Sequence, residues 1–113
     1  MNYTLIIIEP FTGIYGCYSK TVIYHKDSNL LFEKDSDKPL ILKHGIHGDF
    51  YGSPKYPESK FTYSKETLDS VLMCLERDIN NNNIPVSNFY TCYINKFHGS
   101  IVYEFDWRKT EEK

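Results

Sequence analysis

The chain has 113 residues, of which 41% are hydrophobic and 25% are charged, and its formal net charge at pH 7 is −2. This composition is typical of a globular protein, and the length suits one domain with a modest core, so we expect a single domain over residues 1–113. A slightly acidic chain has no overall attraction for nucleic acid or for anionic lipid, and binding to either would need a local basic patch.

The amino-terminal residues and the cysteines predict a reduced, cytoplasmic protein. The first ten residues lack a basic segment, and their apolar run is too short for a signal peptide or a membrane span. Cys17, Cys74 and Cys92 are widely separated and form no CxxC pair, which argues against a disulfide framework and a structural zinc site. We expect no cofactor, no metal and no membrane contact.

Amino-acid usage is biased in a way that bears on the aromatic content. The chain contains ten tyrosines and seven phenylalanines but no alanine and no glutamine. Tyrosine, phenylalanine, asparagine, lysine and isoleucine have AT-rich codons, so an AT-rich phage or bacterial genome accounts for part of this excess. The tyrosines are therefore not by themselves a binding signature.

Four short segments rich in β-branched and aromatic residues occupy the first part of the chain. They cover residues 3–8, 14–24, 30–33 and 40–43, and turn-forming residues separate them. The first segment is apolar on both faces, which is typical of a central strand. Short strands joined by tight turns predict an antiparallel meander.

The periodicity stops at residues 44–61, which are rich in glycine, proline and aromatic residues. A connection of this length without secondary structure is unusual in a small domain, and such loops are often functional. Disordered segments are poor in aromatic residues, so the aromatics here argue for an ordered loop.

Residues 64–79 carry the clearest helix signal. Apolar residues recur at i, i+3, i+4, i+7 and i+11 and form one stripe for burial: Leu68, Val71, Leu72, Leu75 and Ile79. Ser64 is a suitable N-cap, and Tyr63 and Leu68 occupy the positions of a hydrophobic staple. The asparagines at 80–83 and Pro85 predict the end of the helix.

The carboxyl-terminal part predicts a β-hairpin formed by residues 89–95 and 100–107, with its turn near His98 and Gly99. Residues 108–113 form a charged tail that we expect to fray. The predicted fold is therefore α+β, with helix 64–79 on one face of an antiparallel sheet of about five to six strands. One helix covers only part of such a sheet, so the uncovered face is expected to carry exposed tyrosines and alternating charges.

The histidines are the candidates for catalysis. His44 and His47 with Asp49 form an H-x-x-H-x-D cluster, and such groups can bind a transition metal or act as acid and base. A glycine-flanked loop gives this spacing no fixed geometry, so ordinary loop histidines are the main interpretation. A nuclease or hydrolase site built from His25 or His47 with His98 is the alternative. We find no phosphate-binding loop and no cysteine in a setting that would activate it.

The aromatic and acidic residues favour a protein partner over nucleic acid. Tyr90, Tyr93, Tyr103 and Trp107 are candidates for stacking on bases, but the same hairpin holds two carboxylates, and the chain has only two arginines. Tyrosine and tryptophan anchor protein interfaces, and carboxylates complement basic proteins. We predict that the 44–63 loop and the hairpin converge on one surface. The predicted partner-binding residues are Tyr51, Tyr56, Tyr103, Glu104, Asp106 and Trp107.

The predicted function is that of a small protein-binding module that acts as a stoichiometric inhibitor. In general character the chain resembles immunity proteins, antitoxins and phage anti-defence proteins, which are also small, acidic and without a catalytic motif. This likeness covers no specific residues. It implies a basic toxin or a nucleic-acid-handling protein as the partner. A structural or oligomerising role is a further alternative.

Overall fold

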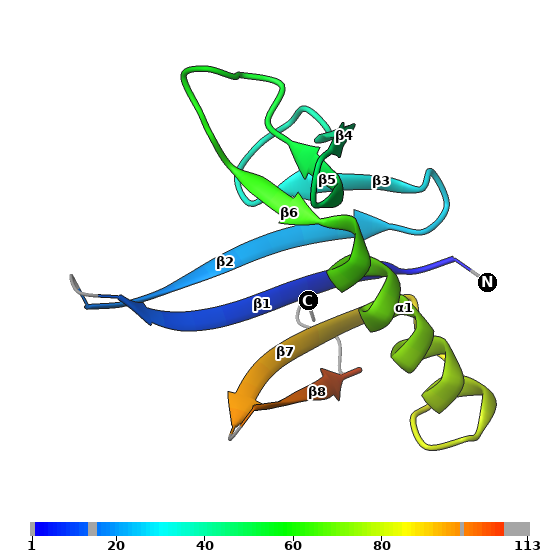
Figure 1. The fold of residues 1–113 in the computed structure, drawn as a ribbon. Helices are drawn as coiled ribbons and strands as arrows, with labels where there is room; N and C mark the ends of the chain where they lie inside the picture. The colour runs from blue at the N-terminus through cyan, green and yellow to red at the C-terminus, as the bar shows by residue number, and fades with distance from the viewer. Residues whose placement is uncertain (1, 14–15, 98, 108–113) are drawn as a thin grey trace.

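Eight strands in two sheets and one helix make up the described part of the chain (Figure 1). This computed structural model describes residues 2–13, 16–97 and 99–107, with the backbone alone at 11–13, 16–18 and 96–97. The elements are β1 (Thr4–Gly13), β2 (Gly16–His25), β3 (Leu30–Glu33), β4 (Ile41–Gly45), β5 (Gly48–Gly52), β6 (Thr62–Ser64), α1 (Lys65–Asn80), β7 (Phe89–Phe97) and β8 (Ser100–Asp106).

The larger sheet has the strand order β3-β2-β1-β7-β8, so β1 is the central strand, as its apolar sequence predicts. The pairs β1–β2, β2–β3 and β7–β8 are antiparallel, which confirms the terminal hairpin and the first three strands of the predicted meander. The fourth predicted strand, at residues 40–43, overlaps β4 and lies in the smaller sheet instead. The pair β1–β7 is parallel, with Ile6 beside Thr91, and the sheet is mixed rather than wholly antiparallel. A parallel pair needs a long crossover, which the smaller sheet and α1 provide.

Helix α1 begins and ends as its sequence predicts. The Ser64 hydroxyl accepts a hydrogen bond from the Thr67 amide at 3.3 Å, and the Asn81 amide donates to the Arg77 carbonyl at 2.9 Å. Leu68, Val71, Leu75 and Ile79 are buried, whereas Leu72 is only partly buried. The helix therefore uses the predicted stripe to cover one face of the larger sheet (Figure 1).

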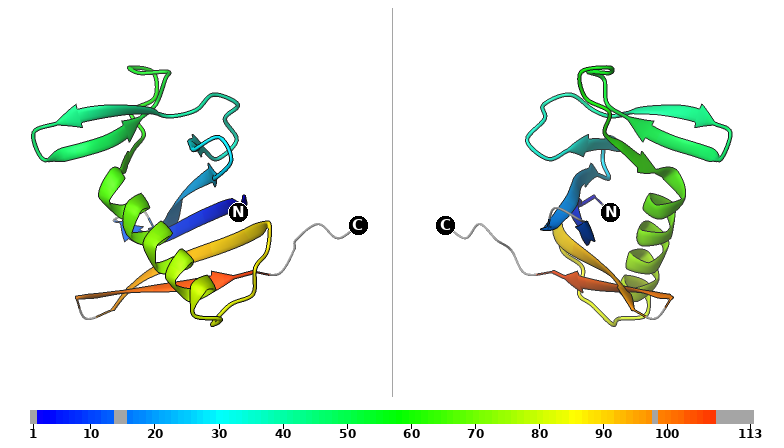
Figure 2. Two further views of the ribbon diagram at one scale, coloured as in Figure 1. Left: turned by 90° about the vertical axis from the view of Figure 1, so that its right-hand side faces the viewer. Right: turned by 60° about the vertical axis from the view of Figure 1, so that its left-hand side comes forward.

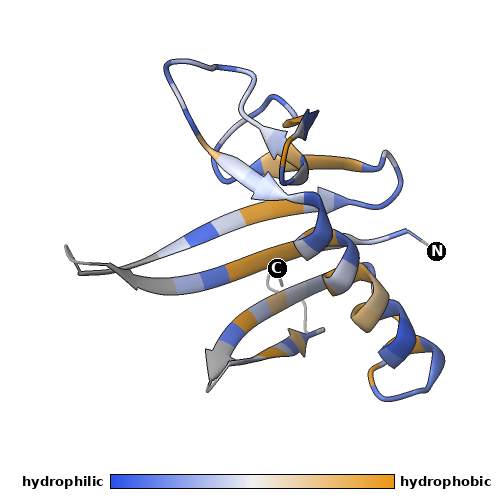
Figure 3. Cartoon of the chain, in the orientation of Figure 1, coloured by the Kyte–Doolittle hydropathy of each residue, from blue (hydrophilic) through white to orange (hydrophobic). Residues whose placement is uncertain are grey.

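The core lies between α1 and this face of the sheet, and the central parts of β1 and β2 are strongly hydrophobic (Figure 3). Alternate residues of each strand point to it because side chains alternate across a strand. The buried apolar residues are Tyr3, Leu5, Ile7, Val22, Tyr24, Leu31, Leu40, Tyr63, Leu68, Val71, Leu75, Ile79, Tyr90, Cys92 and Ile94.

Part of the predicted loop at 44–61 is instead a second sheet, with the order β4-β5-β6. β4 and β5 form a hairpin that pairs His44 with Asp49 and turns at residues 46–47. Gly48, the first residue of β5, adopts a positive φ of 120°. A Cβ at Gly45 would lie 3.1 Å from the Phe50 ring, so the glycine leaves room for that ring on the neighbouring strand. The strand β4 is largely exposed. It overlaps the predicted strand 40–43, whereas β5 falls wholly within the segment predicted as a loop.

The smaller sheet lies beside the β2–β3 end of the larger one, and β8 lies at the opposite end (Figures 1 and 2). One link between the sheets is the Lys20 ammonium, which donates to the Thr62 carbonyl at 2.9 Å. Within the described part of the chain, no helix has the length and apolarity that a membrane span requires.

Candidate functional site

The two faces of the larger sheet differ in what covers them. Helix α1 lies over one face, whereas Figure 2 shows no described helix or strand over the other. We call the uncovered side the open face and assign residues to it from the strand register. Its described strand residues are Thr4, Ile6, Ile8 and Pro10; Ser19, Thr21, Ile23 and His25; Leu30 and Phe32; Phe89, Thr91, Tyr93 and Asn95; and Ser100, Val102, Glu104 and Asp106.

Apolar residues occupy the middle of the open face and carboxylates one edge of it. Ile6, Ile8 and Ile23 are partly exposed there. Among the described strand residues of this face, Glu104 and Asp106 are the only ones with side chains charged at neutral pH. The charge that the described strand residues give to the open face is therefore acidic and is concentrated on β8.

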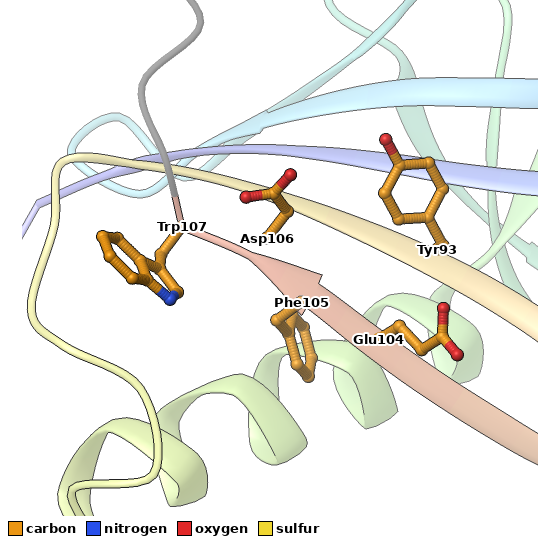
Figure 4. A pocket seen from close by; sticks show the side chains of 5 residues that line it. All are labelled: Tyr93, Glu104, Phe105, Asp106 and Trp107. Carbon is orange, nitrogen blue, oxygen red and sulfur yellow. The ribbon is translucent and has the colours of Figure 1, made fainter.

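An open hollow of about 470 Å³ lies at this acidic edge, lined by Tyr93, Glu104, Phe105, Asp106 and Trp107 (Figure 4). Tyr93 and Glu104 are directly opposite each other in the β7–β8 ladder, and Asp106 is two residues further along β8 on the same face. The exposed fractions of Tyr93 and Trp107 are 40% and 43%. We call Tyr93, Glu104, Asp106 and Trp107 the acidic-aromatic surface.

This arrangement suits a cationic group carried by a macromolecule. Carboxylates attract lysine and arginine, and aromatic rings hold the same cations over their faces. Pockets for small molecules enclose most of the ligand, whereas this hollow is open. A protein surface placed over it would exclude water from both the rings and the carboxylates.

Tyr103, a predicted partner-binding residue, lies on the other side of β8, where it packs against the core near α1. Burial raises the pKa of its hydroxyl, the negative charge of a Cys74 thiolate would raise it further, and a hydrogen bond with Ser70 opposes the shift. Tyr103 is thus part of the contact between sheet and helix and is not on the open face.

Tyr51 lies on β5 of the smaller sheet, and Tyr56 lies in the connection between β5 and β6. Tyr51 pairs with Leu42 and Tyr63 and packs against the core. Tyr56 is exposed, and the Lys43 ammonium lies 5.1 Å from the centre of its ring. The predicted convergence of the 44–63 segment with the terminal hairpin is wrong, because the crossover places β7 and β8 at the far end of the larger sheet (Figure 1).

Three of the four histidines, His25, His44 and His47, lie within the described residues. His44 Nδ1 lies 2.8 Å from Asp49 Oδ1 across the β4–β5 hairpin, and its side chain is 79% exposed. His47 is exposed in the turn. His25 lies in the larger sheet, where its Nδ1 is 3.3 Å from the Thr4 hydroxyl. His98 lies outside the described residues, so its pairing with another histidine stays a prediction.

The described residues contain no group of three or more histidine, cysteine, aspartate or glutamate side chains that could hold a metal ion. Cys92 is buried, and burial raises the pKa of its thiol to about 12. Such a thiol stays protonated at neutral pH and is a poor nucleophile.

Tyr93 is the one member of the acidic-aromatic surface that the sequence-based set of partner-binding residues omits. The sequence itself indicates the side on which Tyr93 lies, because side chains alternate along a strand. Tyr93 lies on the same side of β7 as Thr91 and Asn95, whereas Tyr90 and Ile94 lie on the buried side. Its pairing with Glu104 follows from the hairpin register, which the short turn between residues 97 and 100 sets.

No protein-family model, no curated protein and no solved structure matches the chain.

Proposed function

We propose that this protein is a protein-binding module that takes a basic partner on its open face and acts as a stoichiometric inhibitor of that partner. The observation that carries the proposal is the acidic-aromatic surface. It combines the two charged residues among the described strand residues of the open face with two exposed aromatic side chains.

The distribution of residues on this face resembles that of a protein interface. Partly exposed isoleucines of β1 and β2 lie beside the acidic edge of the sheet. Protein interfaces combine an apolar centre with a polar rim, and tyrosine and tryptophan are enriched among the residues that anchor them. Rim carboxylates chiefly raise the association rate of an oppositely charged partner. We therefore assign anchoring to the aromatic residues and steering to the carboxylates.

A pair of charge-reversal variants tests this assignment. Glu104→Lys with Asp106→Lys changes the proposed surface, and Asp37→Lys with Glu58→Lys is the matched control at two exposed residues outside the strands. Both double variants change the net charge by the same amount. Tagged forms of each protein are used to isolate a partner from cells of the source organism. The purified partner is then studied by calorimetry and by binding kinetics at several salt concentrations.

We expect one-to-one binding, with association at least tenfold slower and less salt-dependent for the Glu104 and Asp106 variant than for the control. Inhibition requires that the activity of an enzymatic partner disappears at one equivalent of this protein. Equal association rates for both variants would contradict the proposed surface. An active partner in the saturated complex would contradict inhibition.

The hydrolase alternative has one observation in its favour, which is the pairing of His44 with Asp49. A carboxylate that orients an imidazole is a common feature of acid–base catalysis. Under the binding proposal, the double change His44→Ala and His47→Ala leaves biological activity within a few-fold of the parent protein, and elemental analysis finds no stoichiometric metal. Loss of several orders of magnitude in activity would favour the hydrolase instead.

A further inference from the structure

The strand β8 ends the larger sheet, and in the described residues no element pairs with its outer edge. It runs for seven residues, and Ile101 and Val102 on it are exposed. The opposite edge strand, β3, has four residues and a further bridge from Phe32 to Pro39. An exposed edge strand offers unpaired backbone donors and acceptors to another extended chain. β8 is therefore the more accessible of the two edges.

The side chains of β8 are divided by chemistry between the two faces. Ile101, Tyr103 and Phe105 point to the side of α1, whereas Glu104 and Asp106 point to the open face. Residues directly opposite each other in neighbouring strands have Cβ atoms about 4.5–5.5 Å apart and interact in pairs. A strand added to β8 would meet apolar groups on one face and carboxylates on the other.

We propose that the partner binds by adding an extended segment to β8 as a sixth strand of the larger sheet. The segment carries lysine or arginine at alternate positions, opposite Glu104 and Asp106, with apolar residues between them that face the side of α1. Backbone hydrogen bonds supply affinity and the alternating side chains supply specificity, as in other cases of strand addition. This inference rests on the proposed function, in which the partner is a basic protein.

A second copy of this chain is a poorer occupant of the same edge. Antiparallel pairing of two β8 strands centred on Glu104 places that residue opposite itself, and pairing centred on Phe105 places Glu104 opposite Asp106. Like charges directly opposite each other destabilise a sheet. Pairing centred on Tyr103 avoids this repulsion, but it places Val102 and Ser100 opposite the carboxylates and offers them no basic group. A basic segment complements both positions.

The probe is a capped peptide of seven residues in which valine and lysine alternate, titrated into the ¹⁵N-labelled full chain. Two further peptides have the same sequence but carry backbone N-methyl groups, one at every valine and the other at every lysine. The amides of consecutive residues point to opposite edges of a strand, so each methylated peptide has one edge without donors. A peptide with glutamate in place of lysine is the charge control.

We expect the parent peptide to shift the β8 amide signals and to slow their hydrogen exchange. One of the two methylated peptides should bind at least tenfold more weakly than the other, and the glutamate peptide should not bind. Glu104→Lys with Asp106→Lys should abolish these effects, whereas Asp37→Lys with Glu58→Lys should preserve them.

Three results would overturn strand addition. The first is an absence of β8 shifts with the parent peptide. The second is equal binding of both methylated peptides with shifts centred on Tyr93 and Ile6, which would mean side-chain docking on the open face and would leave the proposed function intact. The third is protection of β8 in a concentration-dependent dimer without peptide, which would assign the edge to a second copy. Failure of the proposed function itself is seen separately, as equal association rates in the matched charge variants.

Discussion

Tyr93 of β7 and Glu104 of β8 lie directly opposite each other in the antiparallel ladder, so an aromatic ring and a carboxylate share one face of the sheet. Asp106 and Trp107 line the same hollow (Figure 4). The pairing places a group that can anchor a partner next to groups that can attract it. Variants of the two kinds are expected to affect different steps of binding.

Trp107→Ala is expected to accelerate dissociation from the partner. Truncating a desolvated aromatic anchor costs about 2 kcal/mol or more, which corresponds to roughly a thirtyfold rise in Kd. Association should change little, because the charge is unaltered. Surface-based kinetics measure both rates, and Trp107→Phe, which keeps a ring, should recover part of the loss. Unchanged rates for Trp107→Ala would mean that Trp107 does not anchor the partner.

Leu75→Ala is expected to destabilise the fold by about 2–5 kcal/mol, because Leu75 is fully buried in the stripe of α1. Leu72 is only partly buried, so Leu72→Ala should cost less. Met73 is 66% exposed, and Met73→Ala serves as a control that should change the free energy of unfolding by less than about 0.5 kcal/mol. Chemical denaturation measures all three. A cost below about 1 kcal/mol for Leu75→Ala would mean that this stripe does not face the core.

Tyr63→Phe is expected to leave stability unchanged or to raise it by up to about 1 kcal/mol. The buried Tyr63 hydroxyl has no hydrogen-bond partner among the described residues, and burying an unpaired hydroxyl is unfavourable. Tyr3→Phe is the matched comparison, because the Tyr3 hydroxyl donates to Glu76 Oε2 at 2.8 Å. That change should cost about 1 kcal/mol. A loss above 1 kcal/mol for Tyr63→Phe would show that its hydroxyl is paired in solution.

Glu76 is expected to contribute to stability in a pH-dependent way. Burial opposes its ionisation, but hydrogen bonds from Lys26 and Tyr3 outweigh burial and hold the pKa of Glu76 below its usual value of 4.5. The stabilising contribution is therefore complete above pH 4.5 and is lost as the pH falls through the lower pKa of the folded state. Because the ion pair is partly exposed, the contribution is about 0–1 kcal/mol.

The measurement is urea denaturation of the parent protein and of Glu76→Gln between pH 3 and pH 7. The difference between their free energies of unfolding should be largest near neutral pH and should shrink below pH 4.5. A difference that is constant over this range would mean that the ionisation of Glu76 is not coupled to folding.

The sequence by itself was sufficient for the elements that depend on local interactions. The helix is encoded by apolar spacing over four turns and by a capping serine, and both act between residues close in the chain. The terminal hairpin was predicted in the same way, from two alternating runs on either side of a short turn. The central position of β1 was predicted from its apolar residues on both faces, and β1 lies between β2 and β7, although Ile6 and Ile8 are partly exposed on the open face.

The tertiary structure alone decided which strands pair and which residues meet. The parallel pairing of Ile6 with Thr91 joins positions more than 80 residues apart, and no local pattern specifies it. The same crossover separates Tyr51 and Tyr56 from the carboxylates of β8. The strand β4 overlaps the predicted strand 40–43, but its partner β5 was missed, because a five-residue strand with a glycine at each end carries little alternating apolar signal. Pairing between strands far apart in the chain is a non-local property, whereas the register that brings Tyr93 to Glu104 is set by the short turn of the terminal hairpin.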